Sequence, residues 1–283
     1  MLKADSILEK IREERHAFRQ SEQKVAEYIL THPREVIGSP ITELAEVIGV
    51  SEATIVRTCK KIGFKGFHEL KISLAAQNVQ PLQTVHEQIQ DGDDMETIVK
   101  KVFAANIQAM NSTLNVLPVR DLKQAVDALA AANQIHFYGV GGSGSIAQDA
   151  AHKFMKTGKP VAAYVDTHMQ VMAASLLGKG DVVVGISHSG SSRDIIEALE
   201  LARKKGATTI GLTHYAKSPI DKVLDIKLCT ASNETFYRTE STSSRIAQLS
   251  IIDALFIGVS LRDPEKAIEN IQLTREAIAS KRF

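Results

Sequence analysis

Five short apolar runs alternate with helical segments in the second half of the 283-residue chain, and this alternation is the strongest constraint on its fold. The runs cover residues 135–141, 161–165, 181–187, 208–213 and 226–230. Buried strands that alternate with helices form a parallel sheet with helices on both faces. We therefore predict a doubly wound α/β domain here. In such sheets, ligands bind beyond the carboxyl ends of the strands.

Two of the predicted strands end in turns rich in glycine and serine. The first run leads into GVGGSGS, residues 139–145, and the third leads into SHSGSS, residues 187–192. A helix is expected after each turn. Small residues let backbone N–H groups and the positive end of a helix approach a phosphate, and serine hydroxyls donate further hydrogen bonds. Two such turns at one sheet edge indicate an anionic ligand more strongly than either turn alone.

The first turn also fits the dinucleotide-binding pattern G-x-G-x-x-G. Gly139, Gly141 and Gly144 occupy its glycine positions, and Asp166 ends the next apolar run. This interpretation leaves the second serine-rich turn unexplained, and hydroxyl donors suit a terminal phosphate better than a pyrophosphate. A phosphate ester is the preferred ligand, and a dinucleotide is the alternative.

The N-terminal part is predicted to be wholly helical and to contain a helix-turn-helix. Ser21 is the expected cap of one helix and Thr42 of another, which Gly49 ends in a left-handed conformation. Ser51 then caps a following helix that stops at Gly63. Two short helices joined by a glycine-containing turn form a helix-turn-helix.

The second helix of such a motif presents its first residues to the major groove of DNA. The small or polar candidates for DNA contact are Ser51, Glu52, Ala53, Thr54, Arg57, Lys60 and Lys61. The basic residues of the segment 53–71 are Arg57, Lys60, Lys61, Lys65 and Lys71, against the single acid Glu69. The segment is therefore basic although the chain has a net charge of only +1.

Spacing alone leaves two interpretations open, a DNA-binding motif and an ordinary helical pair with a solvated basic face. Glu52 is either an acceptor for a cytosine amino group or a partner of the helix dipole.

Composition excludes several classes of protein. With 44% apolar and 24% charged residues, the chain is neither disordered nor fibrous. Cys59 and Cys229 form no disulfide or zinc pattern, and the histidines lack metal-ligand spacing, so we expect no metal and no cofactor. The N-terminus lacks the apolar core of a signal peptide, and no run reaches the roughly 20 apolar residues of a membrane span. We expect a cytoplasmic protein, with Cys59 as a packing residue.

A linker is predicted between the two parts of the chain. Residues 78–95 lack a sustained apolar period and contain Pro81 and the acidic turn 91–94. The predicted division is a helical DNA-binding domain at 1–77, the linker at 78–95 and the α/β domain at 96–283.

The motifs, in this order, resemble the RpiR family of bacterial transcriptional regulators, in which a helix-turn-helix domain precedes a SIS (sugar isomerase) domain. SEATIVRTCKKIGFKGFHELK resembles the family's recognition helix and its extension. GVGGSGSIAQDAAHKF, ISHSGSSRDIIE and STSSRIAQLSIIDALF resemble its three SIS signatures. The resemblance covers nearly the whole chain except the linker. It implies a regulator that binds a phosphosugar in the SIS domain and adjusts its binding to operator DNA in response.

The resemblance also implies roles for individual residues of the two turns. Phosphate contacts are implied for Ser143, Ser187, Ser189 and Ser192, with Gly141 and Gly190 in the tight turns. The family often has threonine at the position of Ser192, and serine keeps the hydroxyl. Ser145 and Ser191 are equally well explained as turn serines or helix caps.

Residues 165–170 and 233–245 resemble regulators of amino-sugar catabolism, including those that respond to N-acetylmuramic acid 6-phosphate. The implied candidates for sugar contacts are Thr167, His168, Glu234, Arg238 and Arg245. Each has a structural alternative, such as Thr167 as a helix cap, His168 as a partly buried imidazole, or Arg245 as a salt-bridge partner of Asp253.

A SIS-type phosphosugar isomerase or etherase with an accessory helical domain is the alternative function. Glu234 or His168 is chemically able to move a proton, but no motif places an acid and a base together. An attached DNA-binding domain suits a sensor, so we expect no catalytic residues. The expected partners are operator DNA, a phosphosugar and further copies of the chain, in a homodimer or higher homo-oligomer with residues 244–261 as a dimer surface.

Overall fold

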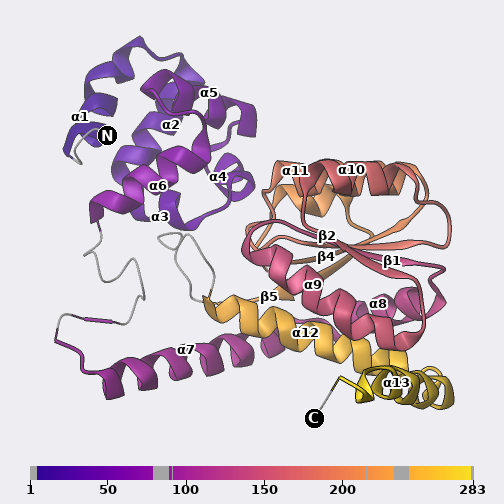
Figure 1. The fold of residues 1–283 in the computed structure, drawn as a ribbon. Coiled ribbons are helices and arrows are strands. Elements are labelled where there is room, and N and C mark those ends of the chain that lie inside the picture. The colour runs from indigo at the N-terminus through magenta and orange to yellow at the C-terminus, as the bar shows by residue number, and fades with distance from the viewer. Residues whose placement is uncertain (1–4, 79–88, 91, 215, 233–241, 282–283) are drawn as a thin grey trace. The chain divides into compact units, whose positions relative to one another are not determined.

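The computed structural model describes residues 5–78, 89–90, 92–214, 216–232 and 242–281. It divides into two compact units (Figure 1). The first comprises most of the chain up to Ala104, and the second most of the chain from Ala105 onward.

The first unit is helical. Its helices are α1 (Asp5–Glu14), α2 (Gln20–Thr31), α3 (Pro33–Gly38), α4 (Ile41–Ile48), α5 (Glu52–Ile62) and α6 (Phe67–Asn78), with a short 3-10 turn at Arg15–Ala17. Apolar residues at helical spacing face a common core, which includes Ile11, Ile29, Leu44, Ile55 and Leu70. Cys59 is fully buried in this core, as predicted for a packing residue, and burial raises the pKa of its thiol to about 12.

The predicted helix-turn-helix is confirmed at α4 and α5. Gly49 ends α4 with φ 72°, and Gly63 ends α5 with φ 105°, both in the left-handed region that favours glycine. The Ser51 hydroxyl caps α5 by accepting a hydrogen bond from the Thr54 N–H at 3.2 Å. Thr42 does not cap α4, because the helix already begins at Ile41.

The predicted cap of α2, Ser21, is also wrong, and Glu22 satisfies the start of this helix in its place. Ser21 lies inside the first turn of α2, which begins at Gln20. The Glu22 carboxylate accepts a hydrogen bond from the Arg19 N–H at 2.9 Å and so satisfies a donor at the start of the helix.

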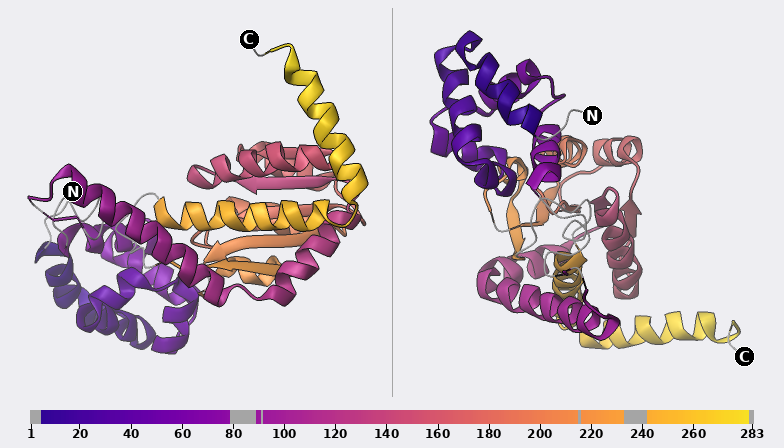
Figure 2. Two further views of the ribbon diagram at one scale, coloured as in Figure 1. Left: turned by 90° about the horizontal axis from the view of Figure 1, so that it is seen from below. Right: turned by 90° about the vertical axis from the view of Figure 1, so that its left-hand side faces the viewer.

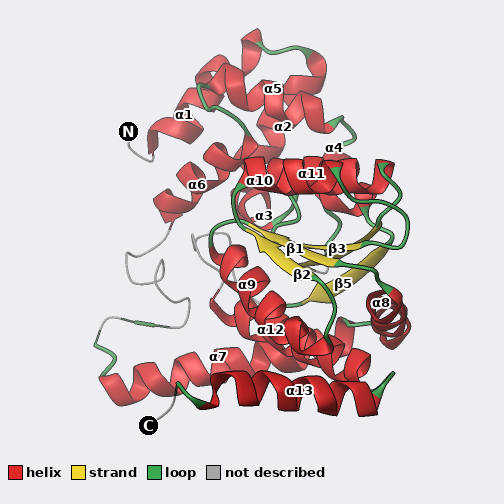
Figure 3. Cartoon of the chain, turned by 45° about the vertical axis from the view of Figure 1, so that its right-hand side comes forward, coloured by secondary structure: helices red, strands yellow, loops and turns green. Residues whose placement is uncertain are grey.

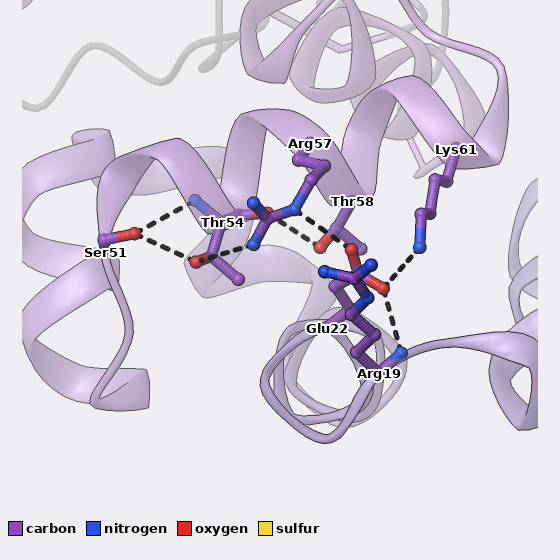
Figure 4. A network of polar contacts seen from close by, with 7 residues as sticks. All are labelled: Arg19, Glu22, Ser51, Thr54, Arg57, Thr58 and Lys61. Atoms are coloured by element: carbon purple, nitrogen blue, oxygen red, sulfur yellow. Dashed lines mark hydrogen bonds and ion pairs between the residues drawn. The ribbon is translucent and has the colours of Figure 1, made fainter.

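Glu22 also joins α2 to α5 (Figure 4). Its side chain is fully buried, and its two oxygens accept hydrogen bonds from Arg57 Nε at 3.1 Å and Lys61 Nζ at 2.6 Å. A buried carboxylate is costly unless it is paired and hydrogen-bonded, and three donors meet this requirement. Contacts with Lys61, the Arg19 N–H and Arg57 lower the pKa of Glu22 from 4.5 to about 2. The network fixes the orientation of α5 on α2.

The second unit is built on a five-stranded parallel sheet. The strands are β1 (Ile135–Gly139), β2 (Val161–Tyr164), β3 (Val182–Ile186), β4 (Thr208–His214) and β5 (Ile226–Thr230). All neighbouring pairs are parallel, in the order β2-β1-β3-β4-β5. The five predicted strands and the doubly wound class are thus confirmed.

Helices cover both faces of this sheet (Figure 3). The helices from Met95 onward are α7 (Met95–Val116), α8 (Val119–Ala131), α9 (Gly142–Phe154), α10 (Thr167–Ser175), α11 (Arg193–Lys204), α12 (Thr242–Ser260) and α13 (Pro264–Ala279), with short 3-10 turns at Met155–Thr157 and Pro219–Val223. Of these, α8, α9 and α12 cover one face, and α10 and α11 cover the other. Because side chains alternate along a strand, Phe137 packs in one core with α8, α9 and α12, and Tyr138 packs in the other with α10 and α11.

The C-terminal helices differ in their packing. α12 lies against the sheet, whereas α13 runs away from it (Figure 2). No single helix among the described residues has the length and apolarity to cross a membrane. The α12–α13 pair meets such a test only jointly and bends by 115° at its junction.

We predict that Glu22→Gln lowers the free energy of unfolding by about 2 kcal/mol at neutral pH, because glutamine removes the negative charge and one of the two oxygens that accept from Arg57 and Lys61. The folded-state pKa of Glu22 is depressed, so its contribution is complete above the unfolded-state pKa of 4.5 and is lost as pH falls toward about 2. The difference between wild type and variant should therefore shrink by about 1 kcal/mol at pH of about 3.5. Calorimetry of the full-length wild type and variant at both pH values measures this difference in the free energy of unfolding.

Glu27→Gln is the matched control. Glu27 lies on the same helix but is 59% exposed and pairs with Arg15 at 3.4 Å, so its loss should cost under about 0.5 kcal/mol. A Glu22→Gln deficit that stays constant with pH contradicts the assigned ionisation.

Candidate functional site

The strand order brings the two glycine- and serine-rich turns together. β1 and β3 are neighbours, with Gly139 opposite Ile186, so the turns that follow these two residues leave the sheet side by side. The chain runs outward in opposite directions from these two strands, which makes this edge a topological switch point. Ligands of doubly wound folds bind in the crevice at such a point.

The first turn opens directly into α9. Gly141 precedes the helix with φ 57° and ψ −129°, a combination that residues with a side chain rarely adopt. Ser143 lies half-buried in the first turn of α9. Backbone N–H groups at the start of a helix lack partners within the helix, so this turn presents donors to an anion.

The second turn opens into α11 in a similar way. Gly190 has φ 59°, and its N–H donates to the Ser187 carbonyl at 3.1 Å, which closes the turn. Ser187 is buried at the end of β3, and Ser189 is exposed. Ser192 is the half-buried residue that precedes α11, and its side chain makes no capping hydrogen bond. Its hydroxyl is thus not used by the helix that it precedes.

The two serines with structural alternatives differ from this set. Ser145 and Ser191 are both exposed. The Ser191 hydroxyl donates to the Ser189 carbonyl at 3.2 Å, as expected for a turn serine.

The structure brings Arg245 to the first turn. A Cβ built on Gly142 would lie 2.9 Å from Nη2 of Arg245, so the guanidinium stands against the first residue of α9. Asp253, the suggested salt-bridge partner of Arg245, pairs with Lys153 at 2.5 Å. A cation beside the N-terminus of α9 adds positive charge where the turns converge.

The structural alternatives for Thr167 and His168 are wrong. Asp166, not Thr167, caps α10, because its Oδ1 accepts a hydrogen bond from the Met169 N–H at 2.9 Å. Thr167 is half-buried, and His168 is exposed rather than buried. Asp166, on which the dinucleotide alternative relied, thus has a local structural role in capping α10. Glu234 and Arg238 lie outside the described residues.

Gln170 is a residue of this edge that sequence reasoning missed. It is fully buried on α10, and its Nε2 donates to the Gly139 carbonyl at 3.2 Å and to the Tyr164 carbonyl at 2.9 Å. It therefore ties together the carboxyl ends of β1 and β2. No sequence pattern marks it, because a buried amide on a helix looks like any exposed glutamine.

Two histidines also meet at this edge. The rings of His188 and His214, which follow β3 and end β4, lie edge to face with centroids 5.4 Å apart. Within the described ranges, no group of three or more side chains has the arrangement of a metal site.

In the helical unit, the candidate DNA-contacting residues differ in exposure. Ala53 and Lys60 are exposed on α5, and Glu52 is half-buried. Thr54 was expected to face outward, but it is buried, and its hydroxyl lies 2.9 Å from that of Ser51. A threonine at this position serves the local structure of the turn.

The charge of α5 and its neighbourhood is lower than the sequence count indicates. Arg57 and Lys61 are paired with Glu22 and keep 51% and 40% of their side-chain surface exposed. Lys71 is buried, donates to the Ser39 carbonyl at 2.8 Å, and has its pKa lowered by burial to about 6. Lys60, by contrast, is exposed and forms no ion pair within the described residues.

Comparisons with known proteins agree with this arrangement of two units. The family model for the helix-turn-helix domain of the rpiR family matches residues 5–81, and the SIS domain model matches residues 128–258. An uncharacterised helix-turn-helix transcriptional regulator of Caldanaerobacter subterraneus is 42% identical over 277 residues, which is 98% of both chains. Another from Bacillus subtilis is 37% identical over 270 residues, 95% of both chains.

A solved structure covers both units. The NanR protein of Vibrio vulnificus, complexed with ManNAc-6P, superposes with a TM-score of 0.84 and 27% identity, over 98% of this chain and 99% of that one. The chain therefore belongs to the rpiR family of helix-turn-helix transcriptional regulators that carry a SIS domain.

Proposed function

We propose that this regulator contacts operator DNA through α5 and senses a phosphosugar at the edge formed by β1 and β3. The observation that carries the proposal is the opening of α9 and α11 side by side at the switch point of the sheet. In this proposal residues 1–77 read DNA, residues 78–95 link the units, and residues 96–283 bind the effector in the cytoplasm.

The phosphate of the effector is bound by donors from both turns. The proposed contacts are the hydroxyls of Ser143, Ser187, Ser189 and Ser192 and the backbone at Gly141 and Gly190. A phosphate dianion gains from two helix N-termini and from hydroxyl donors, and Arg245 beside Gly142 adds a fixed cation. These features suit a terminal phosphate ester.

The sugar end of the effector is proposed to be an amino sugar. NanR of Vibrio vulnificus, which superposes over both units, was solved with ManNAc-6P, and this supports an amino-sugar 6-phosphate for the present chain. Thr167, His168 and Arg245 are the described candidates for sugar contacts. Glu234 and Arg238 complete the proposed set. The chain is proposed to sense this ligand without converting it.

DNA contact is proposed for the exposed side of α5. Ser51, Glu52 and Ala53 begin the helix and lie where a recognition helix meets base edges, and Thr54 supports that turn from within. The proposed phosphate contacts come from Arg57, Lys60 and Lys61.

A homodimer is proposed, with α7 as its contact. α7 is 22 residues long, yet only Ala109 and Thr113 are buried in it. Val99, Phe103, Ile107, Met110 and Leu114 recur every three or four residues and form one exposed apolar stripe. A two-fold axis places the same stripe of a second copy against it, which is how most homodimers bury such a surface. α12, the dimer surface expected from sequence, has Ile251, Ile252 and Leu255 buried in the core of its own unit and exposes Ile246 and Ile257, so α7 offers the longer apolar stripe.

An amino-sugar 6-phosphate should raise the thermal midpoint of the full chain by roughly 5 °C at about 100 times its Kd. The thermal midpoint is measured with ManNAc-6P, N-acetylmuramic acid 6-phosphate, glucose 6-phosphate and inorganic phosphate, and the size of the shift ranks these candidate effectors. The double variant Ser187→Ala, Ser189→Ala should lose the shift and keep DNA binding.

Ser191→Ala is the control, since it removes a neighbouring turn hydroxyl and should keep the full shift. A normal shift in the double variant would place the phosphate elsewhere. Consumption of a sugar phosphate at enzymatic rates would favour the isomerase or etherase alternative.

Lys60→Ala should weaken binding to any DNA duplex and lower the slope of log affinity against log salt by about one phosphate contact. Lys60 tests the DNA-contacting face more cleanly than Arg57 or Lys61, whose removal also disturbs the buried Glu22. Lys24→Ala is the matched control, because Lys24 is exposed on the side of α2 opposite to Glu22. Equal salt slopes for the two variants contradict the assignment of α5.

Phe103→Asp or Leu114→Asp should convert the dimer to a monomer in light scattering, because either substitution places a charge in the apolar stripe. The two side chains are 66% and 75% exposed, so the fold of the monomer should be kept. Gln108→Asp, on the opposite side of α7, should leave the dimer intact. A wild-type monomer at micromolar concentration, or a dimer unaffected by both substitutions, would refute this interface.

A further inference from the structure

Glu22 and its two cationic partners form an unusual group for a surface that is proposed to bind a polyanion. Arg57 and Lys61 lie one helical turn apart on α5, and both donate to a carboxylate that comes from α2 (Figure 4). The carboxylate is fully buried, whereas the cations are 51% and 40% exposed. The acid is therefore shielded from solvent and the cations are not.

This arrangement fixes the conformations of two long side chains. Arg57 uses Nε for Glu22 at 3.1 Å and Nη2 for the Thr54 hydroxyl at 3.4 Å, so its guanidinium is held at two points. The Thr54 hydroxyl in turn lies 2.9 Å from that of Ser51, the cap of α5. Lys61 is held by Glu22 at 2.6 Å and lies above the Phe18 ring at 6.0 Å.

Free arginine and lysine side chains lose conformational entropy when they are ordered on binding. Here the protein has already ordered them in the absence of DNA.

The fixed cations keep donors for a further partner. Among the described residues, Nη1 of Arg57 has no hydrogen-bond partner, and Lys61 Nζ uses one of its three N–H groups for Glu22. The group of one acid and two bases retains a net charge of +1 at the surface of α5.

We propose that Glu22 is a positioning residue for operator recognition, which holds Arg57 and Lys61 in the orientations that contact DNA phosphates in a single register. The inference rests on the proposed function of α5 as the DNA-reading helix. Phosphate contacts fix the register and orientation of a protein on the duplex, and that register decides which bases the start of α5 meets. Glu22 would therefore increase discrimination between DNA sequences although it touches no DNA.

The alternative role of Glu22 is only to pack α2 against α5. The two roles differ in their effect on non-specific binding. Glu22→Gln keeps the shape of the side chain and an acceptor for the Arg19 N–H, but it removes a negative charge and so makes the face more positive by one. Non-specific affinity depends on charge, so it should stay equal or rise even as the register is lost.

The experiment begins with a duplex selected from a random-sequence pool by the full-length wild-type protein. Affinities for this duplex and for an unrelated duplex of equal length are then measured below the melting temperature of each variant. For Glu22→Gln, we expect affinity for the selected duplex to fall about tenfold while affinity for the unrelated duplex does not fall. Glu27→Gln, an exposed carboxylate on the same helix, makes the same change in charge and should keep the wild-type ratio.

An unchanged ratio for Glu22→Gln, or an equal loss on both duplexes, overturns the positioning role. If Glu22→Gln does not fold, Arg57→Lys decides, because it keeps the charge of a half-exposed side chain but lacks the two-point hold. The ratio of its affinities for the selected and the unrelated duplex should fall at least about threefold, while the slope of log affinity against log salt stays unchanged. An unaltered ratio would again overturn the inference. Failure of the wild type to enrich any sequence would instead refute the proposed function.

Discussion

The parallel direction of the five strands is the constraint on which the effector-binding unit depends. All carboxyl ends meet at one edge, so each helix that follows a strand there begins with its positive end at that edge. The order β2-β1-β3-β4-β5 then makes the turns at Gly141 and Gly190 neighbours. A site for an anion therefore needs no charged side chain at its base, and Arg245 adds charge to a field that the backbone already supplies.

Each unit uses one buried polar side chain to hold elements that form its proposed functional surface. Gln170 joins the ends of β1 and β2 through two backbone carbonyls, and Glu22 joins α2 to α5 through two cations. Both side chains are fully buried. Inside a protein, such bonds are directional and costly to break, so they define a single arrangement where apolar packing alone tolerates several. Under the proposed function, positions of this kind act through the geometry of other residues.

The sequence predicted features that depend on neighbouring residues. The strands were found because buried parallel strands are short apolar runs, and Gly49, Gly63 and Ser51 follow from local backbone geometry. Features set by distant partners were missed. Arg57 meets Glu22 across 35 positions, and this pairing, together with the burial of Lys71, is why a charge count along one segment overstated the basic surface. Strand order is equally non-local, and so was not predicted. Predictions for residues 233–241 lie outside the described structure.

In the proposed regulator, α7 links the sheet edge to the proposed dimer contact. The Thr113 hydroxyl donates to the Ala231 carbonyl at 3.1 Å and accepts from the Ala231 N–H at 3.0 Å, directly after the carboxyl end of β5. The carboxyl end of β5, at the same sheet edge as the proposed effector site, is thus bonded to the helix that carries the apolar stripe. An effector changes DNA affinity only by its different affinities for two arrangements, typically about 1–3 kcal/mol of coupling. A change of that size corresponds to one or two hydrogen bonds, the scale of the Thr113–Ala231 contact itself.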